Sequence, residues 1–198
     1  MNFVERDTEL DLVARVRAGD TAAFDAVHAE FNTRLFNFLA RLSRRREVAE
    51  DLLEETWLRF VDRAPRLRDD TRLGPFLFTI ARNLHISYCR SRSIEDQYAA
   101  SLLGLWPAGS PQPSPFDSTI ANETGRRIDA ALASLPAIYR EALLLIAFED
   151  LRPAEAAEVC GISPEAMRQR ISRARSLLAR TLDERDLARL VSLKEVMT

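Results

Sequence analysis

A group of arginines toward the C-terminal end of the chain has the residue types and the spacing to bind nucleic acid. Residues 164–180 have no acidic side chain after Glu165, although the whole chain has a formal net charge of −2. Guanidinium groups bind phosphates and the edges of guanine bases, and a helix that carries them fits the major groove of DNA. The alternative is a surface helix whose arginines are merely solvated. The arginines in question are Arg168, Arg170, Arg173, Arg175 and Arg180.

The residues just before these arginines predict a helix-turn-helix. Ala157, Gly161 and Met167 have the spacing of a small residue at a helix crossing, a turn glycine and an apolar anchor. Ser163 can cap the second helix, and Pro164 is suited to its first position because no amide proton is needed there. We therefore expect a second helix that starts at Pro164 and holds the arginines.

An acidic stretch lies in the first half of the chain, where it is opposed only by Arg59 and Arg63. Helical spacing places most of its carboxylates opposite the apolar side chains of the same segment, so the charge should face outward. Such a face repels DNA and favours docking to a basic protein, although an ordinary solvated helix face is the alternative. The acidic residues are Glu47, Glu50, Asp51, Glu54, Glu55 and Asp62.

A second basic segment follows the acidic one and predicts a second contact with nucleic acid. Its opposing acids are Asp69 and Asp70, and we expect Asn83, His85 and Ser87 along its exposed side. Asparagine, serine and arginine bind base edges and phosphates. Two such sites on one chain would make the spacing between two DNA elements part of the specificity. The arginines are Arg66, Arg68, Arg72, Arg82, Arg90 and Arg92.

Metal binding and catalysis have little support in the sequence. His85 and Cys89 lie four residues apart on one helical face, but two ligands do not make a metal site, and His28 and Cys160 have no supporting spacing. The cysteines form no CxxC pair, and neither a glycine-rich phosphate loop nor a nucleophile motif is present. We therefore expect no metal, no cofactor, no catalytic residue and no enzyme activity.

Apolar residues recur at intervals of three and four along the chain, which predicts an all-α fold of two small helical domains joined by a flexible linker. In the third segment we expect one apolar face made of Val48, Leu52, Leu53, Trp57, Phe60 and Val61. The expected helices are about 8–18, 21–43, 47–64, 73–91, 123–134 and 136–148, followed by the helix-turn-helix. The domains are 1–92 and 123–182, with a proline-containing linker at 93–122 and a C-terminal extension at 183–198.

Composition limits where the protein works. With 46% hydrophobic and 29% charged residues the chain is globular rather than disordered. Its first residues, MNFVERDTELDLV, lack the basic and then apolar order of a secretory signal, and no stretch is apolar enough for a membrane span. We expect a cytoplasmic protein without direct membrane insertion.

Several segments, in their order and spacing, resemble one known family. The chain is similar to the bacterial sigma factors of the extracytoplasmic-function group over about residues 8–182. The motifs that carry the resemblance are AEDLLEETWLRF (49–60), FLFTIARNL (76–84), LASLPAIYREALLL (132–145) and ISRARSLL (171–178). The resemblance implies that 1–92 is sigma region 2, a four-helix bundle, and that 123–182 is sigma region 4, with its helix-turn-helix.

The resemblance also implies partners for each surface. The acidic segment resembles the part that docks on the β′ clamp helices of core RNA polymerase, and the β flap is a further contact of this family. In this chain the docking residues would be Asp51, Glu54, Glu55 and Leu58. An anti-sigma factor is an expected partner, because members of the family are commonly held inactive by one.

Promoter DNA is the third partner that the resemblance implies. The segment 73–91 resembles the reader of the minus-ten element, where a base leaves the stack and the opened strand is held. Its candidate contacts are Arg82, Asn83, Ser87 and Arg90. The helix-turn-helix resembles the reader of the minus-thirty-five element, with the candidates Glu165, Arg168, Gln169, Arg170, Arg173 and Arg175.

Two other functions fit some of these features. A sigma-like decoy would sequester an anti-sigma factor without recruiting polymerase, but it would not need the arginines of the second helix of the motif. A stand-alone helix-turn-helix regulator usually dimerises, and this sequence has no obvious symmetric seam.

Overall fold

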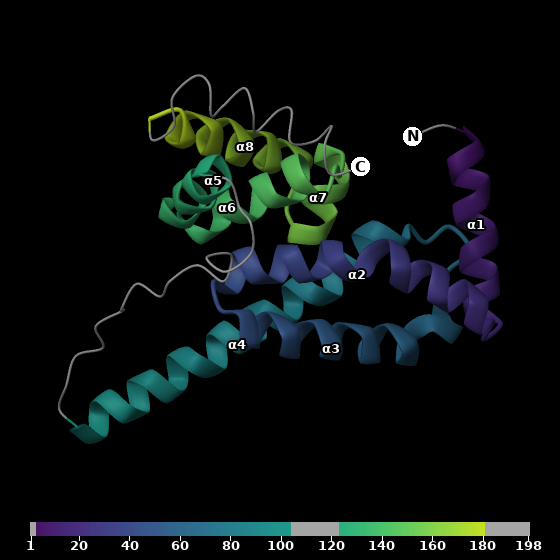
Figure 1. Ribbon diagram of the computed structural model, residues 1–198, viewed down its shortest axis with the longest axis horizontal. Coiled ribbons are helices and arrows are strands. Elements are labelled where there is room, and N and C mark those ends of the chain that lie inside the picture. The colour runs from purple at the N-terminus through teal and green to yellow at the C-terminus, as the bar shows by residue number, and fades with distance from the viewer. Residues whose placement is uncertain (1–2, 104–122, 181–198) are drawn as a thin grey trace.

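The computed structural model describes residues 3–103 and 123–180, with side chains described for 8–93 and 127–180 (Figure 1). Within these ranges every regular element is a helix, which confirms the predicted all-α fold. The proline-containing part of the predicted linker, 104–122, and the predicted C-terminal extension, 183–198, lie outside the described residues.

The N-terminal bundle consists of the first four α-helices and a short 3-10 turn. Two predicted segments match within a residue, but the first helix starts earlier than Thr8 and the fourth continues well beyond Ser91. The extra length of the fourth helix has a local reason, because residues 93–103 contain neither proline nor glycine and are rich in alanine and leucine. The elements are α1 (Phe3–Arg17), α2 (Thr21–Ser43), α3 (Arg46–Arg63), η1 (Ala64–Arg66) and α4 (Leu73–Leu103).

The C-terminal bundle consists of four short α-helices and one π-helical turn. The π turn directly continues the second of these helices. In it the amide of Glu149 donates to the carbonyl of Leu144, five residues back, at 3.1 Å. The second helix of the helix-turn-helix starts at Pro164, as predicted, but ends at Leu178, before Arg180. The elements are α5 (Glu123–Ser134), α6 (Ala137–Leu143), the π turn η2 (Leu144–Phe148), α7 (Pro153–Cys160) and α8 (Pro164–Leu178).

The turn between α1 and α2 shows how local sequence sets these boundaries. Gly19 has a φ of +81°, a left-handed conformation that ends α1 at little cost for a residue without a side chain. The carboxylate of Asp20 then accepts the amides of Ala22 and Ala23 at 2.9 and 3.3 Å, which caps α2.

Aromatic side chains hold α2, α3 and α4 together. Phe60 of α3 is fully buried and contacts the rings of Phe24 and Phe76, with centroids 5.2 and 6.3 Å apart. The indole of Trp57 donates to the side-chain oxygen of Asn32 at 3.0 Å, so its polar edge is satisfied where it enters the core.

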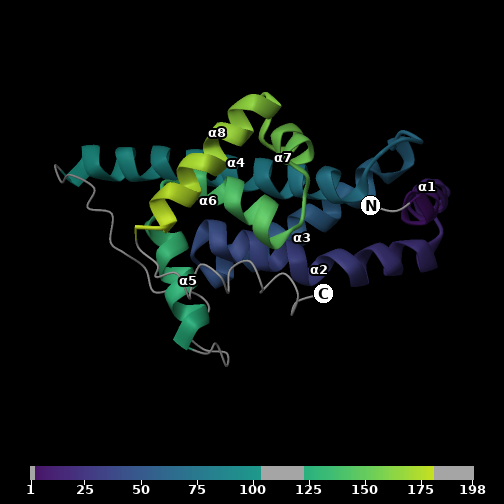
Figure 2. The same ribbon diagram turned by 90° about the horizontal axis from the view of Figure 1, so that it is seen from above.

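The two bundles pack directly on one another. Figure 1 shows the C-terminal bundle stacked on α2 and α4, with α8 on the side of the molecule opposite α3, and Figure 2 shows α1 end-on at the edge of the assembly. The buried residues of both bundles form one continuous cluster. Gly74 of α4 lies where the bundles meet, and a Cβ there would make ordinary van der Waals contacts, 3.5 Å from Phe31 of α2 and 3.9 Å from Leu151 of the C-terminal bundle.

Candidate nucleic-acid interface

The turn between α7 and α8 has the geometry that the sequence predicts. Gly161 adopts a φ of +63°, and the amide of Ile162 donates to the carbonyl of Ala157 at 3.0 Å. The hydroxyl of Ser163 accepts the amide of Ala166 at 3.1 Å and caps α8. Met167 is fully buried, as expected of an anchor, so the two helices meet at a fixed angle.

The outer side of α8 is a basic surface, as predicted. Its inner side is apolar, and the residues between are exposed polar side chains with no acid after Glu165. The buried residues are Met167, Ile171, Ala174 and Leu178. The exposed candidates for DNA contact are Glu165, Arg168, Gln169, Arg173 and Arg175.

Arg170 differs from the other arginines of α8. Its side chain is 24% exposed and points toward α6 of the same bundle, where its Nη1 lies 4.0 Å from Oε2 of Glu141. The predicted contacts of α8 are therefore brought together except for Arg170, whose charge is partly engaged inside the protein.

The predicted contacts on α4 fall into two environments. Asn83, Ser87 and Arg90 are exposed on one side of the helix. Arg82 is only 16% exposed, and its Nε donates to Oε1 of Glu141, across the boundary between the bundles, at 2.7 Å. The two sets of candidates, one on α4 and one on α8, thus meet at a single carboxylate.

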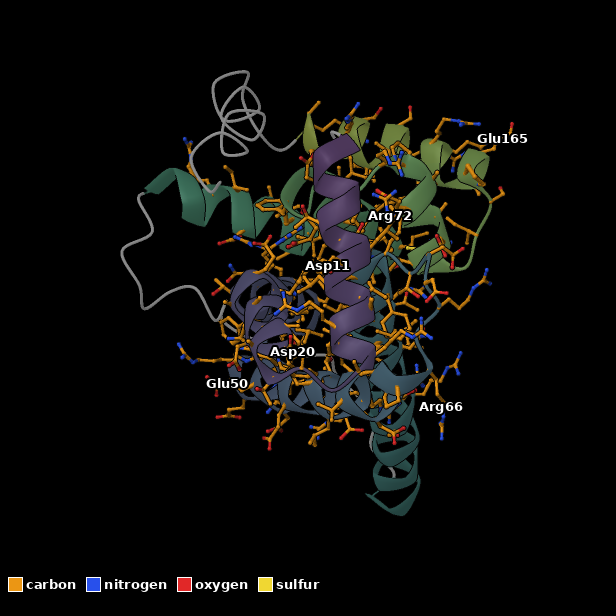
Figure 3. The ribbon with its side chains drawn as sticks, turned by 90° about the vertical axis from the view of Figure 1, so that its right-hand side faces the viewer. Asp11, Asp20, Glu50, Arg66, Arg72 and Glu165 are labelled. Atoms are coloured by element: carbon orange, nitrogen blue, oxygen red, sulfur yellow. The ribbon has the colours of Figure 1, made fainter. Side chains whose placement is uncertain are left out.

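The expectation that all arginines of 66–92 face solvent is wrong for two of them. Arg72 and Arg82 point to the C-terminal bundle, because carboxylates that lie far away in the sequence are brought opposite them by the packing. Nη1 of Arg72 lies 2.5 Å from Oε1 of Glu155. In Figure 3 Arg72 lies between α1 and the C-terminal bundle, whereas Arg66 and Glu165 lie at the periphery.

The acidic side of α3 faces outward, as predicted. Glu50, Asp51 and Glu54 are exposed, and Glu55 is paired on the same helix with Arg59, whose Nε donates at 2.7 Å. The prediction that Val61 lies in the core is wrong. Val61 is 52% exposed and lies one turn from Leu58, which is 59% exposed. An acidic face with apolar residues beside it is typical of a protein contact rather than of plain solvation.

His85 and Cys89 lie close together, with 3.6 Å between Nε2 and Sγ, but they gain no third ligand. No group of three or more His, Cys, Asp or Glu side chains suited to a metal ion occurs in the described part of the chain. Burial lowers the pKa of His85, which keeps the imidazole neutral near pH 7.

Four carboxylates that lie between the bundles could not be predicted from the sequence, three of them buried and Asp129 partly exposed. Each of these acids stands next to apolar residues in the sequence, as in EALLLIAFED (141–150). An acid in such a segment indicates a carboxylate with a partner inside the protein rather than one that is simply solvated. Burial raises the pKa of Glu149 to about 7, although Arg34 opposes the shift. The four are Asp129, Glu141, Glu149 and Glu155.

Arg140 is a buried arginine that serves the backbone rather than a partner molecule. Its guanidinium donates to the carbonyls of Leu132, Ala133 and Leu135 at 2.9 Å each, where α5 ends. Burial, with Arg44 nearby, lowers the pKa of Arg140. The residue thus satisfies carbonyl groups that the end of a helix leaves without partners.

No helix within the described ranges has the length and apolar character needed to cross a membrane.

Two family profiles match the chain, one for each bundle. The profile described as Sigma-70 region 2 matches residues 28–95, and the profile described as Sigma-70, region 4 matches residues 125–178.

Relatives match over nearly their whole length. RNA polymerase sigma factor CarQ of Myxococcus xanthus is 34% identical over 173 residues, which cover 87% of this chain and 97% of CarQ. ECF RNA polymerase sigma factor SigM of Bacillus subtilis is 29% identical over 78% of this chain and 91% of its own.

Solved structures show the same arrangement of helices. Sigma factor RpoE of Bartonella quintana, in complex with the anti-sigma factor NepR, has a TM-score of 0.67 and 28% identity over 81% of this chain and 97% of RpoE. CnrH, in complex with the cytosolic domain of CnrY, has a TM-score of 0.65 at 22% identity, over 88% of this chain and 97% of CnrH.

Proposed function

This chain belongs to the extracytoplasmic-function sigma factors of the sigma-70 family, and we propose on that premise how its surfaces divide the work of transcription initiation. One observation carries the proposal: α3 and α8 present charges of opposite sign on opposite sides of one molecule (Figure 1). A basic surface suits DNA and an acidic one suits a basic protein surface. A single chain with both can connect an enzyme to its template.

The acidic side of α3 is the surface proposed to dock on the β′ clamp helices of core RNA polymerase. Asp51, Glu54 and Leu58 are exposed on it, and Glu55 is partly so, which allows charge complementarity with an apolar contact beside it. The C-terminal bundle would contact the β flap. The chain itself would perform no catalysis, because the polymerase supplies the chemistry.

The exposed side of α4 is proposed to read the minus-ten element. Asn83 offers a paired donor and acceptor to an extruded base, while Ser87 and Arg90 on the same side suit the sugar-phosphate backbone. Arg82 would join them once it is released from Glu141.

The outer side of α8 is proposed to read the minus-thirty-five element in the major groove. Arg168 and Gln169 lie in the first turns of the helix, nearest to where the base edges would be, and Arg173 and Arg175 suit phosphates further along. Arg170 and Glu165 flank this surface and would contact DNA at its edge.

An anti-sigma factor is proposed as the regulator. The support is that RpoE of Bartonella quintana, a related sigma factor, was solved in complex with the anti-sigma factor NepR. A role in a stress or envelope response is proposed from the resemblance to the extracytoplasmic-function group. Because chromosomal DNA and polymerase are its partners, we place the protein in the cytoplasm.

The experiment that tests the proposal is transcription with the purified chain, core polymerase free of other sigma factors, and genomic DNA fragments, followed by mapping of the transcript starts. We expect new starts that share two upstream elements at a fixed spacing. The same starts with and without the chain would overturn the proposal, and a decoy that only sequesters an anti-sigma factor would give that result.

A second experiment tests the docking surface on α3. Replacing Glu54 and Glu55 together with lysine should weaken association with core polymerase at least about tenfold, because two favourable charges become repulsive. The matched control reverses two exposed acids elsewhere, Asp25→Lys with Glu158→Lys. Equal binding of both variants and the unaltered chain would remove Glu54 and Glu55 from the interface.

A further inference from the structure

Among the described residues, four ion pairs with short distances cross the boundary between the two bundles. In each of them the arginine belongs to the N-terminal bundle and the carboxylate to the C-terminal bundle. The distances between the charged atoms range from 2.5 to 3.1 Å. The pairs are Arg34 with Glu149, Arg41 with Asp129, Arg72 with Glu155, and Arg82 with Glu141.

The carboxylates of these pairs are well shielded from water. Their side chains are between 3% and 10% exposed, while the arginines keep between 14% and 33%. A shielded carboxylate needs its partner, because removing one member of such a pair leaves the other charged and poorly solvated. Arg41, Arg72 and Arg82 with their carboxylates therefore favour packing of the bundles only while both members of a pair are charged and in place. Burial raises the pKa of Glu149 to about 7, so near neutral pH its contact with Arg34 is partly a hydrogen bond to a neutral carboxyl rather than an ion pair.

Glu141 has a special position among the four acids. Its Oε1 accepts from Arg82 of α4 at 2.7 Å, its Oε2 lies 4.0 Å from Arg170 of α8, and the thiol of Cys160 donates to Oε2 at 3.4 Å. Arg82 and Arg170 are both among the proposed DNA contacts, one for each promoter element. A single internal carboxylate thus lies next to one proposed contact for each promoter element.

We propose that these ion pairs form an electrostatic latch between the bundles, in which Glu141 competes with DNA for Arg82 and Arg170. At Arg82 the competition is for a hydrogen bond, because the single Nε proton that it donates to Glu141 cannot be donated to a phosphate at the same time. At Arg170, 4.0 Å from Glu141, the competition is between two negative charges for one guanidinium. Binding of DNA and packing of the bundles then oppose each other. The latch is a property of the free chain. It rests on the proposed function only for which DNA elements the two arginines would bind.

The test measures the distance between the bundles and the affinity for DNA in the free chain, without polymerase. Donor and acceptor dyes are attached to Ala29→Cys in α2 and Ala179→Cys after α8, both exposed positions, in a Cys89→Ser background. Cys160 stays unlabelled, because it is buried and burial raises the pKa of its thiol to about 12. A short mixed-sequence DNA duplex is the probe for affinity.

Three substitutions that each remove one negative charge are compared. Glu141→Gln removes the charge that faces both Arg82 and Arg170, whereas Asp129→Asn breaks only the pair with Arg41, far along the chain from the residues proposed to contact DNA. Glu158→Gln is the matched control, because Glu158 is exposed on α7. Circular dichroism checks that each variant keeps its helices.

We expect Glu141→Gln and Asp129→Asn to lower energy transfer and to bind the duplex about fivefold more tightly than Glu158→Gln does. Unchanged transfer in both folded variants would overturn the latch, and so would lower transfer without a gain in affinity over the control. Either result would leave the transcription experiment unaffected, so failure of the latch and failure of the proposed function can be told apart.

Discussion

The helices α8 and α4 both carry arginines at helical spacing, yet the two sets have different surroundings. Arg168, Arg173 and Arg175 of α8 are exposed, whereas Arg82 of α4 is 16% exposed and paired with Glu141. The residue type is the same in both helices, and the difference comes from what the packing of the bundles places opposite each side chain. An arginine can bind DNA without first leaving an internal ion pair only where no carboxylate of the same chain reaches it.

The largest effect is expected for an arginine that is wholly enclosed. Replacing Arg140 with methionine keeps the bulk but removes three hydrogen bonds to carbonyls at the end of α5. We expect the free energy of unfolding in urea to fall by about 3 kcal/mol. The exposed Arg173→Met should change it by less than about 0.5 kcal/mol, and similar losses in both variants would remove the distinction between enclosed and exposed arginines.

A smaller effect, on binding rather than folding, is expected for an exposed arginine of α8. Arg168→Ala should cost about 1 to 3 kcal/mol of affinity for the matching promoter and relax the preference at one base position. The measurement is binding to a set of promoters that differ at single positions. An equal loss on every sequence would instead assign Arg168 to a phosphate.

Within α4, the exposed Asn83 can be compared with its neighbour Arg82, which is shielded and paired with Glu141. Asn83→Ala should slow promoter opening about tenfold and leave polymerase binding unchanged, since the base contact forms only after the strands separate. Permanganate reactivity of the opened strand measures the effect, with the exposed Ser91→Ala as control. Normal reactivity in the Asn83 variant would count against the contact.

The smallest effect concerns the pH dependence of the boundary between the bundles. Burial raises the pKa of Glu149 to about 7 from an ordinary value of 4.5, so the folded chain holds a proton there that the unfolded chain has lost. This stabilisation is complete below pH 4.5 and disappears as the pH rises through 7.

Between pH 6 and pH 8 the unaltered chain should therefore lose about 1 kcal/mol of stability that Glu149→Gln does not lose. Thermal unfolding of both chains across this range measures the difference. Parallel curves would show that Glu149 is ionised throughout, held by Arg34 at 3.1 Å.

Patterns with a local cause could be predicted from the sequence. The caps of α2 and α8, the left-handed Gly161 and the buried Met167 depend on neighbours in the chain, and the structure has them where the sequence places them. The exposed acids of α3 follow in the same way, because the helical period separates them from the core.

Features that depend on contacts between distant segments could not be predicted. Arg82 and Glu141 are 59 residues apart, and Arg34 and Glu149 are 115 apart, so no local pattern joins them. Val61 fits the apolar period of α3, but the neighbouring helices cover too narrow a strip of the α3 surface to bury it. The roles in binding that the sequence suggests for the surface residues stay predictions.

The π turn η2 has a consequence for how this protein can vary. A π turn holds one residue more than a turn of α-helix, which changes the helical phase by about 100°, and Glu149, which contacts Arg34, directly follows it. Deleting one residue within Leu144–Phe148 would restore a regular helix and rotate everything after it, however well the remaining side chains were kept. In this segment the number of residues is therefore under stricter constraint than their identity, and a natural variant would tolerate exchanges there more readily than a gap.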